Sequence, residues 1–157
     1  MTIFTVGYEG VTPEQFLERL HRAKIQLVVD VRDVPLSRKP GFSKTALSSA
    51  LELVGLQYFH IRELGCPKPI RDQYRADGNW QAYTVAFMSH LRKQRFAIRT
   101  LAQMCTQTRA ALLCYEADPE QCHRTYVARA VAALQDHRVM HIGAQGVIRD
   151  RASAVAA

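Results

Sequence analysis

The sequence predicts a single-domain α/β protein with a mostly parallel sheet of about five strands and helices on both faces. Short apolar runs alternate with amphipathic segments along the chain, and strands separated by helices pair in parallel. The chain has 157 residues, of which 48% are hydrophobic, which is enough for one core. We find no repeat or linker, so we expect one domain over residues 1–142 and a loose C-terminal tail over residues 143–157.

The first half of the chain predicts three strands and two helices. Residues 3–6 form an apolar run, after which Thr12 and Pro13 supply the N-cap and first position of a helix. Residues 27–29 form a continuous apolar run typical of a buried parallel strand. A helix that follows the cap residue Ser43, and a strand over residues 56–61, complete this half.

The second half begins with residues 62–79, whose prolines and glycines predict a long loop. A helical region is expected from Trp80 to about Cys105, with a break near residues 93–95. The apolar run 110–113 predicts a buried strand. A helix over residues 119–136, capped by Asp118, and a short strand over residues 139–142 are expected to follow.

The charge and the cysteines restrict the class of partner and the compartment. A formal charge of +7 favours a phosphate-bearing partner, and the basic residues gather after predicted strands, in segments 32–44 and 62–75. Four cysteines without a disulfide pattern predict reduced thiols in the cytoplasm. We find neither a secretory signal nor the roughly 18 apolar residues of a membrane span, so no membrane association is expected. The oligomeric state is not predicted.

The segment from Leu112 to Arg124 is the most informative part of the chain. A predicted strand ends at Cys114, and the first turn of the following helix is expected to carry Cys122, His123 and Arg124. These groups and Glu116 gather at a strand-to-helix junction, where open α/β sheets bind ligands. The unpaired N–H groups of a helix start attract anions and lower the pKa of a nearby thiol.

Four roles are open for this cluster. The two cysteines could be buried structural residues, because free cysteine is among the most buried residue types. They could perform thiolate chemistry or help to bind an anion. Cys114 and Cys122 could also form a redox-active disulfide. A metal is the least expected, because Cys-x7-Cys-His lacks the paired spacing of structural zinc sites, and we expect neither metal nor cofactor.

A second polar motif begins where the second predicted strand ends. A carboxylate that emerges from an apolar run is costly unless it is paired or does chemistry. Asp30 is therefore either a general base or the partner of Arg32 in a buried pair that fixes the loop. Arg32 and Arg38 have the planar fork that suits phosphate, and Ser37 could donate to the same anion. Tyr8, after the first strand, is expected to face the same crevice.

Five motifs follow one another over about residues 3–142. They are Thr5-Val6-Gly7-Tyr8-Glu9-Gly10, Val29-Asp30-Val31-Arg32 with Pro35, Ser37-Arg38 and Phe42-Ser43, Tyr58-Phe59-His60 with Leu64-Gly65, Leu113-Cys114-Tyr115-Glu116, and Cys122-His123-Arg124. Together they resemble the widespread prokaryotic family catalogued as domain of unknown function 488. The resemblance implies that the family's recurrent positions correspond to Tyr8, Asp30, Arg32, Pro35, Ser37, Phe42, Cys114, Glu116, Cys122, His123 and Arg124. It supports the site and leaves the reaction open.

The leading functional prediction is a small cytoplasmic enzyme that acts on a phosphate-bearing substrate, either a nucleotide or a nucleic acid. Either cysteine could be the nucleophile, with His123 or Glu116 transferring protons. The expected catalytic residues are Cys114, Cys122, His123, Glu116 and Asp30. The expected substrate-binding residues are Tyr8, Arg32, Ser37, Arg38 and Arg124.

Two other functions stay open. The net charge, the basic loops and the interleaved aromatic residues also fit a non-catalytic nucleic-acid-binding module. Asp30-Val31-Arg32 after an apolar strand resembles a short element of rhodanese-like domains, in which a thiolate would carry a persulfide for sulfur transfer. The composite site requires segments 30–38 and 114–124 to lie on the same side of the molecule.

Overall fold

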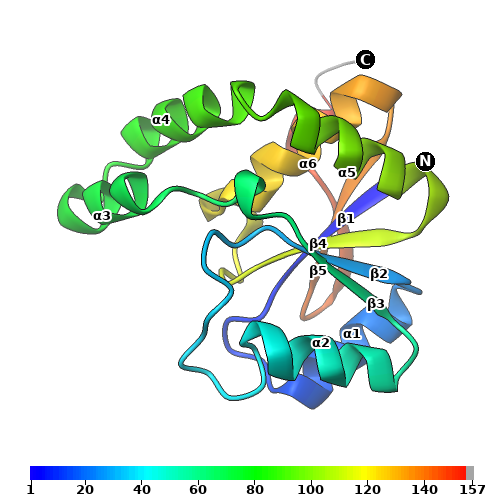
Figure 1. Cartoon of the computed structure of the whole chain (residues 1–157). Coiled ribbons are helices and arrows are strands. Elements are labelled where there is room, and N and C mark those ends of the chain that lie inside the picture. The colour runs from blue at the N-terminus through cyan, green and yellow to red at the C-terminus, as the bar shows by residue number, and fades with distance from the viewer. Residues whose placement is uncertain (155–157) are drawn as a thin grey trace.

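The computed structural model describes residues 1–154 and contains one six-stranded sheet with helices on both faces (Figure 1). The strands are β1 (Thr2–Gly7), β2 (Leu27–Asp30), β3 (Gln57–His60), β4 (Ala110–Cys114), β5 (Arg138–Gly143) and β6 (Gly146–Arg149). The α-helices are α1 (Pro13–Arg22), α2 (Lys44–Leu53), α3 (Lys68–Asp77), α4 (Trp80–Arg92), α5 (Arg95–Gln107) and α6 (His123–Gln135). Short 3-10 helices are η1 (Arg62–Leu64), η2 (Pro119–Gln121) and η3 (Arg151–Ala154). The predicted α/β class is confirmed.

The order of the strands brings distant loops together. The sheet runs β3-β2-β4-β1-β5-β6, with strands β1 to β5 parallel and β6 antiparallel to β5. β4 lies between β1 and β2, where Cys114 aligns with Gly7 and Leu113 aligns with Asp30. The segments that follow β1, β2 and β4 therefore leave the same edge of the sheet side by side.

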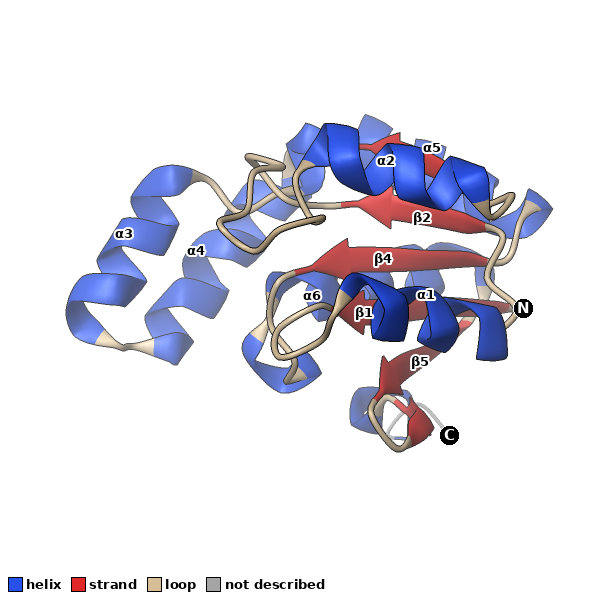
Figure 2. Cartoon of the chain, turned by 90° about the horizontal axis from the view of Figure 1, so that it is seen from below, coloured by secondary structure: helices blue, strands red, loops and turns tan. Residues whose placement is uncertain are grey.

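Each face of the sheet has its own hydrophobic core. Helices α1 and α2 cover one face, and α5 and α6 cover the other (Figure 2). Phe16 of α1 and Leu47 of α2 pack with Val28 on the first face, whereas Leu101 of α5 packs with Val29 on the second. Because both faces are covered, β2 and β4 are buried along their whole length, which explains their continuous apolar runs.

The expected loop over residues 62–79 is largely helical. Helix α3 runs antiparallel beside α4, and the two project beyond the sheet (Figures 1 and 2). Pro69 lies in the first turn of α3, where its missing N–H would have no helical partner, so it is tolerated there. Gly78 ends the helix in a left-handed conformation with φ 63°. The residues that suggested a loop are thus start and stop signals of a helix.

The expectation of a loose tail is also wrong for residues 143–154. Strand β6 pairs with β5, and the backbone N–H of Asp150 donates to Val139. Asp150 is buried and receives two hydrogen bonds from Arg129 of α6, each at 2.8 Å. β6 is exposed throughout, so its sequence lacks the apolar run that predicts a buried strand. The last three residues of the expected tail, 155–157, lie outside the described residues.

Candidate active site

A pocket of about 610 Å³ lies where the segments after β1, β2 and β4 meet. Residues of the α3–α4 pair form its outer wall, so the pocket lies between the sheet edge and the projecting helices. The expected convergence of segments 30–38 and 114–124 is therefore present. The lining residues are Tyr8, Arg32, Asp33, Val34, Leu36, Ser37, Arg38, Lys39, Cys66, Arg71, Tyr74, Arg75, Trp80, Tyr83, Cys114, Tyr115, Glu116, Gln121 and His123.

The two sulfurs and the imidazole form a compact cluster at the pocket floor. Cys114 is the last residue of β4, Cys122 is the N-cap of α6, and His123 is the first residue of that helix. Their ligand atoms all lie within 4.8 Å of one another. Of the two thiols, only Cys114 lines the pocket.

The start of α6 differs from the prediction. Asp118 and Pro119 open the 3-10 helix η2, in which the Asp118 carboxylate accepts from the Glu120 N–H. The chain is then extended at Cys122, with φ −144° and ψ 138°, before α6 begins. Cys122 is therefore the N-cap of the helix, one position before the first turn in which it was expected.

The orientation of the His123 ring fixes which nitrogen faces sulfur. Its Nε2 lies 2.7 Å from the Val31 carbonyl oxygen, which only accepts, so Nε2 carries a proton. Its Nδ1 lies 3.7 Å from the Cys114 Sγ. The loop after β2 thereby orients the imidazole toward the thiol.

Arg124 is a buried cation beside these thiols. It is 1% exposed, and its guanidinium donates to the carbonyls of Glu116 and Ala117, which fixes the turn after β4. No carboxylate of residues 1–154 forms an ion pair with it, and its Nε has no partner among them. Arg124 does not line the pocket, so direct binding of substrate, as predicted, has no support.

The cluster shifts the pKa of each of its titratable groups. Burial alone would raise the pKa of Cys122, but a hydrogen bond from Cys114 and the charges of Arg124 and His123 hold it well below its usual value. The hydrogen bond to Cys122 and burial raise the pKa of Cys114. These opposite shifts favour a thiolate at Cys122 over one at Cys114.

The neighbours of the thiolate respond to that charge. Burial, followed by repulsion from Cys122, raises the pKa of Glu116 to about 7. The Glu116 Oε2 lies 3.1 Å from the Cys122 Sγ, within hydrogen-bonding distance. Burial lowers the pKa of His123, but hydrogen bonding to Cys122 and its charge raise it overall. Near neutral pH the site can therefore hold or release protons with little change in free energy.

Asp30 and Arg32 form a buried pair that builds the pocket wall. Both Asp30 oxygens accept from the Arg32 guanidinium, at 2.9 and 2.7 Å, and Tyr58 donates to the same carboxylate. Arg32 also donates to the Tyr8 hydroxyl and to the Phe42 carbonyl. Asp30 has no exposed surface and does not line the pocket, so it fixes the loop and is not placed for the predicted catalytic role.

The cations of the pocket rim come from two segments. Arg38 and Lys39 follow β2, and the Lys39 Nζ donates to the Tyr8 carbonyl. The Ser37 hydroxyl accepts from the Lys39 N–H and also lines the pocket. Arg71 and Arg75 of α3 form the opposite side. Arg71 pairs with Asp33 and Arg75 pairs with Asp72, so the excess positive charge of the lining comes mainly from Arg38 and Lys39.

Several lining residues were not predicted. Cys66 reaches the pocket because Gly65 packs directly on the backbone of Asp33, where a Cβ would overlap it. Burial raises the pKa of Cys66 to about 11, so it stays a neutral thiol. Trp80 and Tyr83, which stack on each other, form the aromatic wall on α4. The basic segment 62–75 and the aromatic residues Tyr74, Trp80 and Tyr83, which could form a base-stacking surface, were the signals for this side, and nothing in the sequence indicated Cys66.

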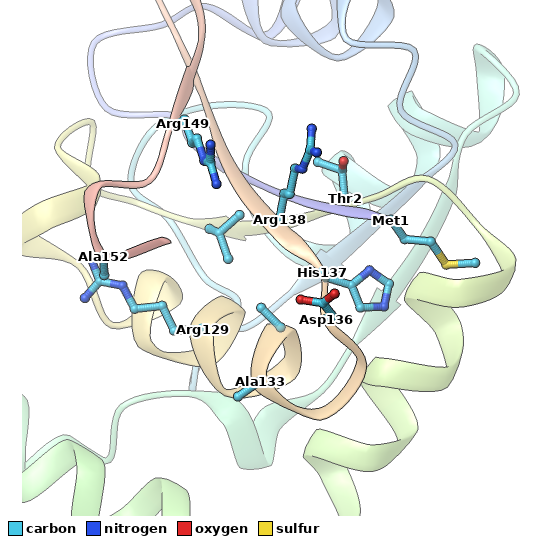
Figure 3. A pocket seen from close by; sticks show the side chains of 11 residues that line it. Met1, Thr2, Arg129, Ala133, Asp136, His137, Arg138, Arg149 and Ala152 are labelled. Atoms are coloured by element: carbon cyan, nitrogen blue, oxygen red, sulfur yellow. The ribbon is translucent and has the colours of Figure 1, made fainter. Parts of the chain in front are cut away.

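A second, larger hollow of about 780 Å³ lies near the first residues of β1 and β5 (Figure 3). Arg129, Arg138, Arg149 and His137 line it, together with small residues of α6. None of the predicted site residues lines this hollow, and none of its lining residues is a nucleophilic thiol. Of these two hollows, the one lined by Cys114 combines open volume with a thiol and an imidazole.

The fold and this pocket define an α/β protein with a thiol–imidazole cluster at the carboxyl edge of its sheet. Residues 12–131 match the family described as domain of unknown function DUF488. The match covers most of the chain, which therefore belongs to this family, as its motifs predicted. No curated protein and no solved structure matches the chain. No helix among residues 1–154 is both long enough and apolar enough to cross a membrane.

Proposed function

We propose that the protein is an enzyme that binds a phosphate-bearing substrate, a nucleotide or a nucleic acid, and attacks it with the Cys114 thiolate. The observation that carries this proposal is the position of Cys114. Its sulfur lines the pocket, 3.7 Å from the His123 Nδ1, beneath a rim that includes Arg38 and Arg75. A nucleophile, a cation to hold its charge and an anion-binding rim thus lie in one pocket.

The reaction would begin with a proton shift between the two sulfurs. Cys114 gives its proton to the Cys122 thiolate, and the negative charge moves to the sulfur that faces the pocket. Cys114 then forms a bond to the electrophilic atom of the substrate as the bond to the leaving group breaks. Glu116, which lines the same pocket, is placed to give its proton to the leaving group. His123 stays oriented by Val31 and stabilises the anionic sulfur.

Thiol trapping tests this proposal. Reduced, chelator-treated protein is incubated with limiting iodoacetamide, with or without a mixture of nucleoside triphosphates, and alkylation is mapped by mass spectrometry. We expect Cys114 to be labelled first and the nucleotides to protect it. Cys105, buried on α5 away from the pocket, is the matched control. Equal unreactivity of Cys114 and Cys122 in the folded protein would remove the nucleophile from the proposal.

The exposed cations of the rim favour a second candidate, a nucleic-acid-binding module without catalysis. The α3–α4 pair projects beyond the sheet (Figure 1), and its residues Arg75, Trp80 and Tyr74 line one side of the pocket. Binding of a single-stranded oligonucleotide would weaken steeply as salt rises. Replacing Cys114 by Ser would leave that binding unchanged, whereas the enzyme proposal expects the variant to lose substrate turnover.

Sulfur transfer is a third candidate function, because two neighbouring thiols are compatible with it. In that case Cys114 would carry a persulfide, which a sulfane-sulfur donor and a cyanolysis assay would detect. We further propose a reducing, cytoplasmic compartment, because Cys66, Cys105, Cys114 and Cys122 are all free thiols.

A further inference from the structure

The thiol–imidazole cluster has a property that its proposed chemistry does not use. Cys114, Cys122 and His123 each offer one ligand atom, and these atoms lie within 4.8 Å of one another. They come from the end of β4 and the start of α6, two elements of the rigid core. Sulfur and imidazole nitrogen are the ligands that zinc prefers in proteins.

We propose that Cys114, Cys122 and His123 bind a zinc ion at the pocket floor. The spacing suits it, because zinc–sulfur bonds of about 2.3 Å and zinc–nitrogen bonds of about 2.0 Å in a tetrahedral site place sulfur and nitrogen about 3.5 Å apart. The Cys114 Sγ and His123 Nδ1 are 3.7 Å apart. This pair is therefore already near the spacing that zinc requires, and the Cys122 Sγ lies within 4.8 Å of both atoms.

The surroundings of the cluster meet the other requirements of a zinc site. The Val31 carbonyl holds the proton on the His123 Nε2, which frees Nδ1 as the ligand and fixes the ring, as outer-shell partners do in zinc proteins. The Glu116 carboxylate, 3.1 Å from the Cys122 Sγ, is a candidate for the fourth ligand. The charges of zinc and buried Arg124 would then be balanced by two thiolates and this carboxylate.

The local sequence did not predict the site because its ligand pattern is unusual. Structural zinc sites commonly take ligands in C-x2-C pairs, whereas here Cys114 and Cys122 are separated by a turn and η2. The fold brings them together across that turn. Zinc would bind through the same sulfur lone pair that the proposed nucleophile uses. Cys114 of the metal-bound protein would therefore not attack a substrate. Metal binding does not depend on the identity of the substrate.

Cobalt titration tests the site without any assay of activity. Chelator-treated protein, kept reduced with a phosphine, is titrated with Co²⁺, and zinc is then added as a competitor. We expect one equivalent of Co²⁺ to give sulfur-to-metal charge-transfer absorption and the visible bands of a tetrahedral site, and zinc to abolish both. C114S and C122S should each weaken binding by at least the roughly 100-fold that losing an outer-shell partner can cost. C105S and C66S are matched controls and should bind as the wild type does.

A second measurement on the wild type covers the case in which a variant does not fold. Zinc should protect Cys114 and Cys122 from alkylation and leave the labelling of Cys66 and Cys105 unchanged, as mapped by mass spectrometry. Absence of sulfur-to-metal absorption, or protection that is equal at all four cysteines, overturns the zinc site. The proposed enzyme is tested separately in chelated protein, so failure of one proposal does not imply failure of the other.

Discussion

Two buried arginines lie at the same edge of the sheet, and they differ in how their charge is balanced. Arg32 donates to both oxygens of the Asp30 carboxylate, at 2.9 and 2.7 Å. Arg124 donates only to the carbonyls of Glu116 and Ala117, and none of the carboxylates in residues 1–154 forms an ion pair with it. Asp30 thus neutralises the charge of Arg32 within the loop, whereas the charge of Arg124 acts on the thiols.

The difference separates the scaffold of the pocket from its chemistry. A buried cation with its own carboxylate fixes a loop and changes little when a ligand arrives. A buried cation without one favours a neighbouring anion, which here is the thiolate at Cys122. Replacing residues of the first kind should change stability, and replacing residues of the second kind should change reactivity.

The largest effect is expected for Asp30→Ala. The substitution leaves the buried Arg32 guanidinium without its anion, and removing one partner of a buried pair costs about 3–5 kcal/mol. Urea unfolding would measure this loss in the free energy of unfolding. Asp72→Ala is the matched control, because Asp72 pairs with Lys68 on the exposed side of α3 and should leave the midpoint unchanged. A small effect of Asp30→Ala would mean that Arg32 is not held by this pair.

The second-largest loss in the free energy of unfolding is expected for Asp150→Asn, at the junction of α6 and β6. Asp150 accepts two hydrogen bonds from Arg129 and one from His141, so the loss should be about 1.5–3 kcal/mol. Burial tends to raise the pKa of Asp150, but these hydrogen bonds hold it below its ordinary value of 3.8. The stability that Asp150 contributes is therefore complete above that value and is lost as pH falls through the lower, folded pKa.

Thermal unfolding against pH checks this sign. The difference in melting temperature between wild type and Asp150→Asn should be constant from pH 7 to about pH 5 and should shrink on further acidification. A difference that grows with acid would contradict the account of this network.

Arg124→Met should change reactivity more than Asp30→Ala does. Removing the positive charge raises the thiol pKa, and one pKa unit corresponds to about tenfold less thiolate. We expect the alkylation of Cys114 near pH 7 to slow by about that factor, as measured by quenched labelling and mass spectrometry. Arg92→Met, which removes an exposed cation at the end of α4 outside the pocket lining, is the matched control. Equal rates of Cys114 alkylation in the two variants would show that Arg124 does not lower the pKa of the thiols.

The smallest effect is expected for Arg75→Ala on the pocket rim. Arg75 is exposed, so its loss should leave the free energy of unfolding within about 0.5 kcal/mol of the wild type. Binding of a nucleoside triphosphate, measured by calorimetry at low salt, should weaken by a few fold, because one of several cations is removed. Arg92→Ala, at the end of α4 and outside the pocket lining, should leave binding unchanged.

Much of the fold followed from the sequence because parallel strands need crossover helices between them. The alternation of apolar runs and capped helices gave the strands β1 to β5 and the order of most helices. The exceptions have local causes. Pro69 starts α3 where it was taken to break regular structure, and β6 is an exposed edge strand without an apolar run.

Which predicted residues would meet at one pocket followed from the sequence in part, whereas their roles did not. Cys114, Glu116 and His123 line one pocket, because strand ends in a parallel sheet share an edge. Which residues face that pocket depends on where α6 begins, and an extended residue at Cys122 cannot be told from a first-turn residue by composition. Asp30 and Arg124 therefore turned from expected site residues into supports, while Cys66 was brought in by the close contact at Gly65.

The central claim is that Cys114, and not a merely buried thiol, is the reactive group of this pocket. The most direct measurement compares the alkylation rates of Cys114 and Cys105 within the same folded, metal-free molecules. Cys114 lines the pocket and Cys105 does not, so the account predicts that Cys114 reacts faster and that nucleotides slow only its reaction. Equal rates at the two cysteines, both rising only on unfolding, would contradict it.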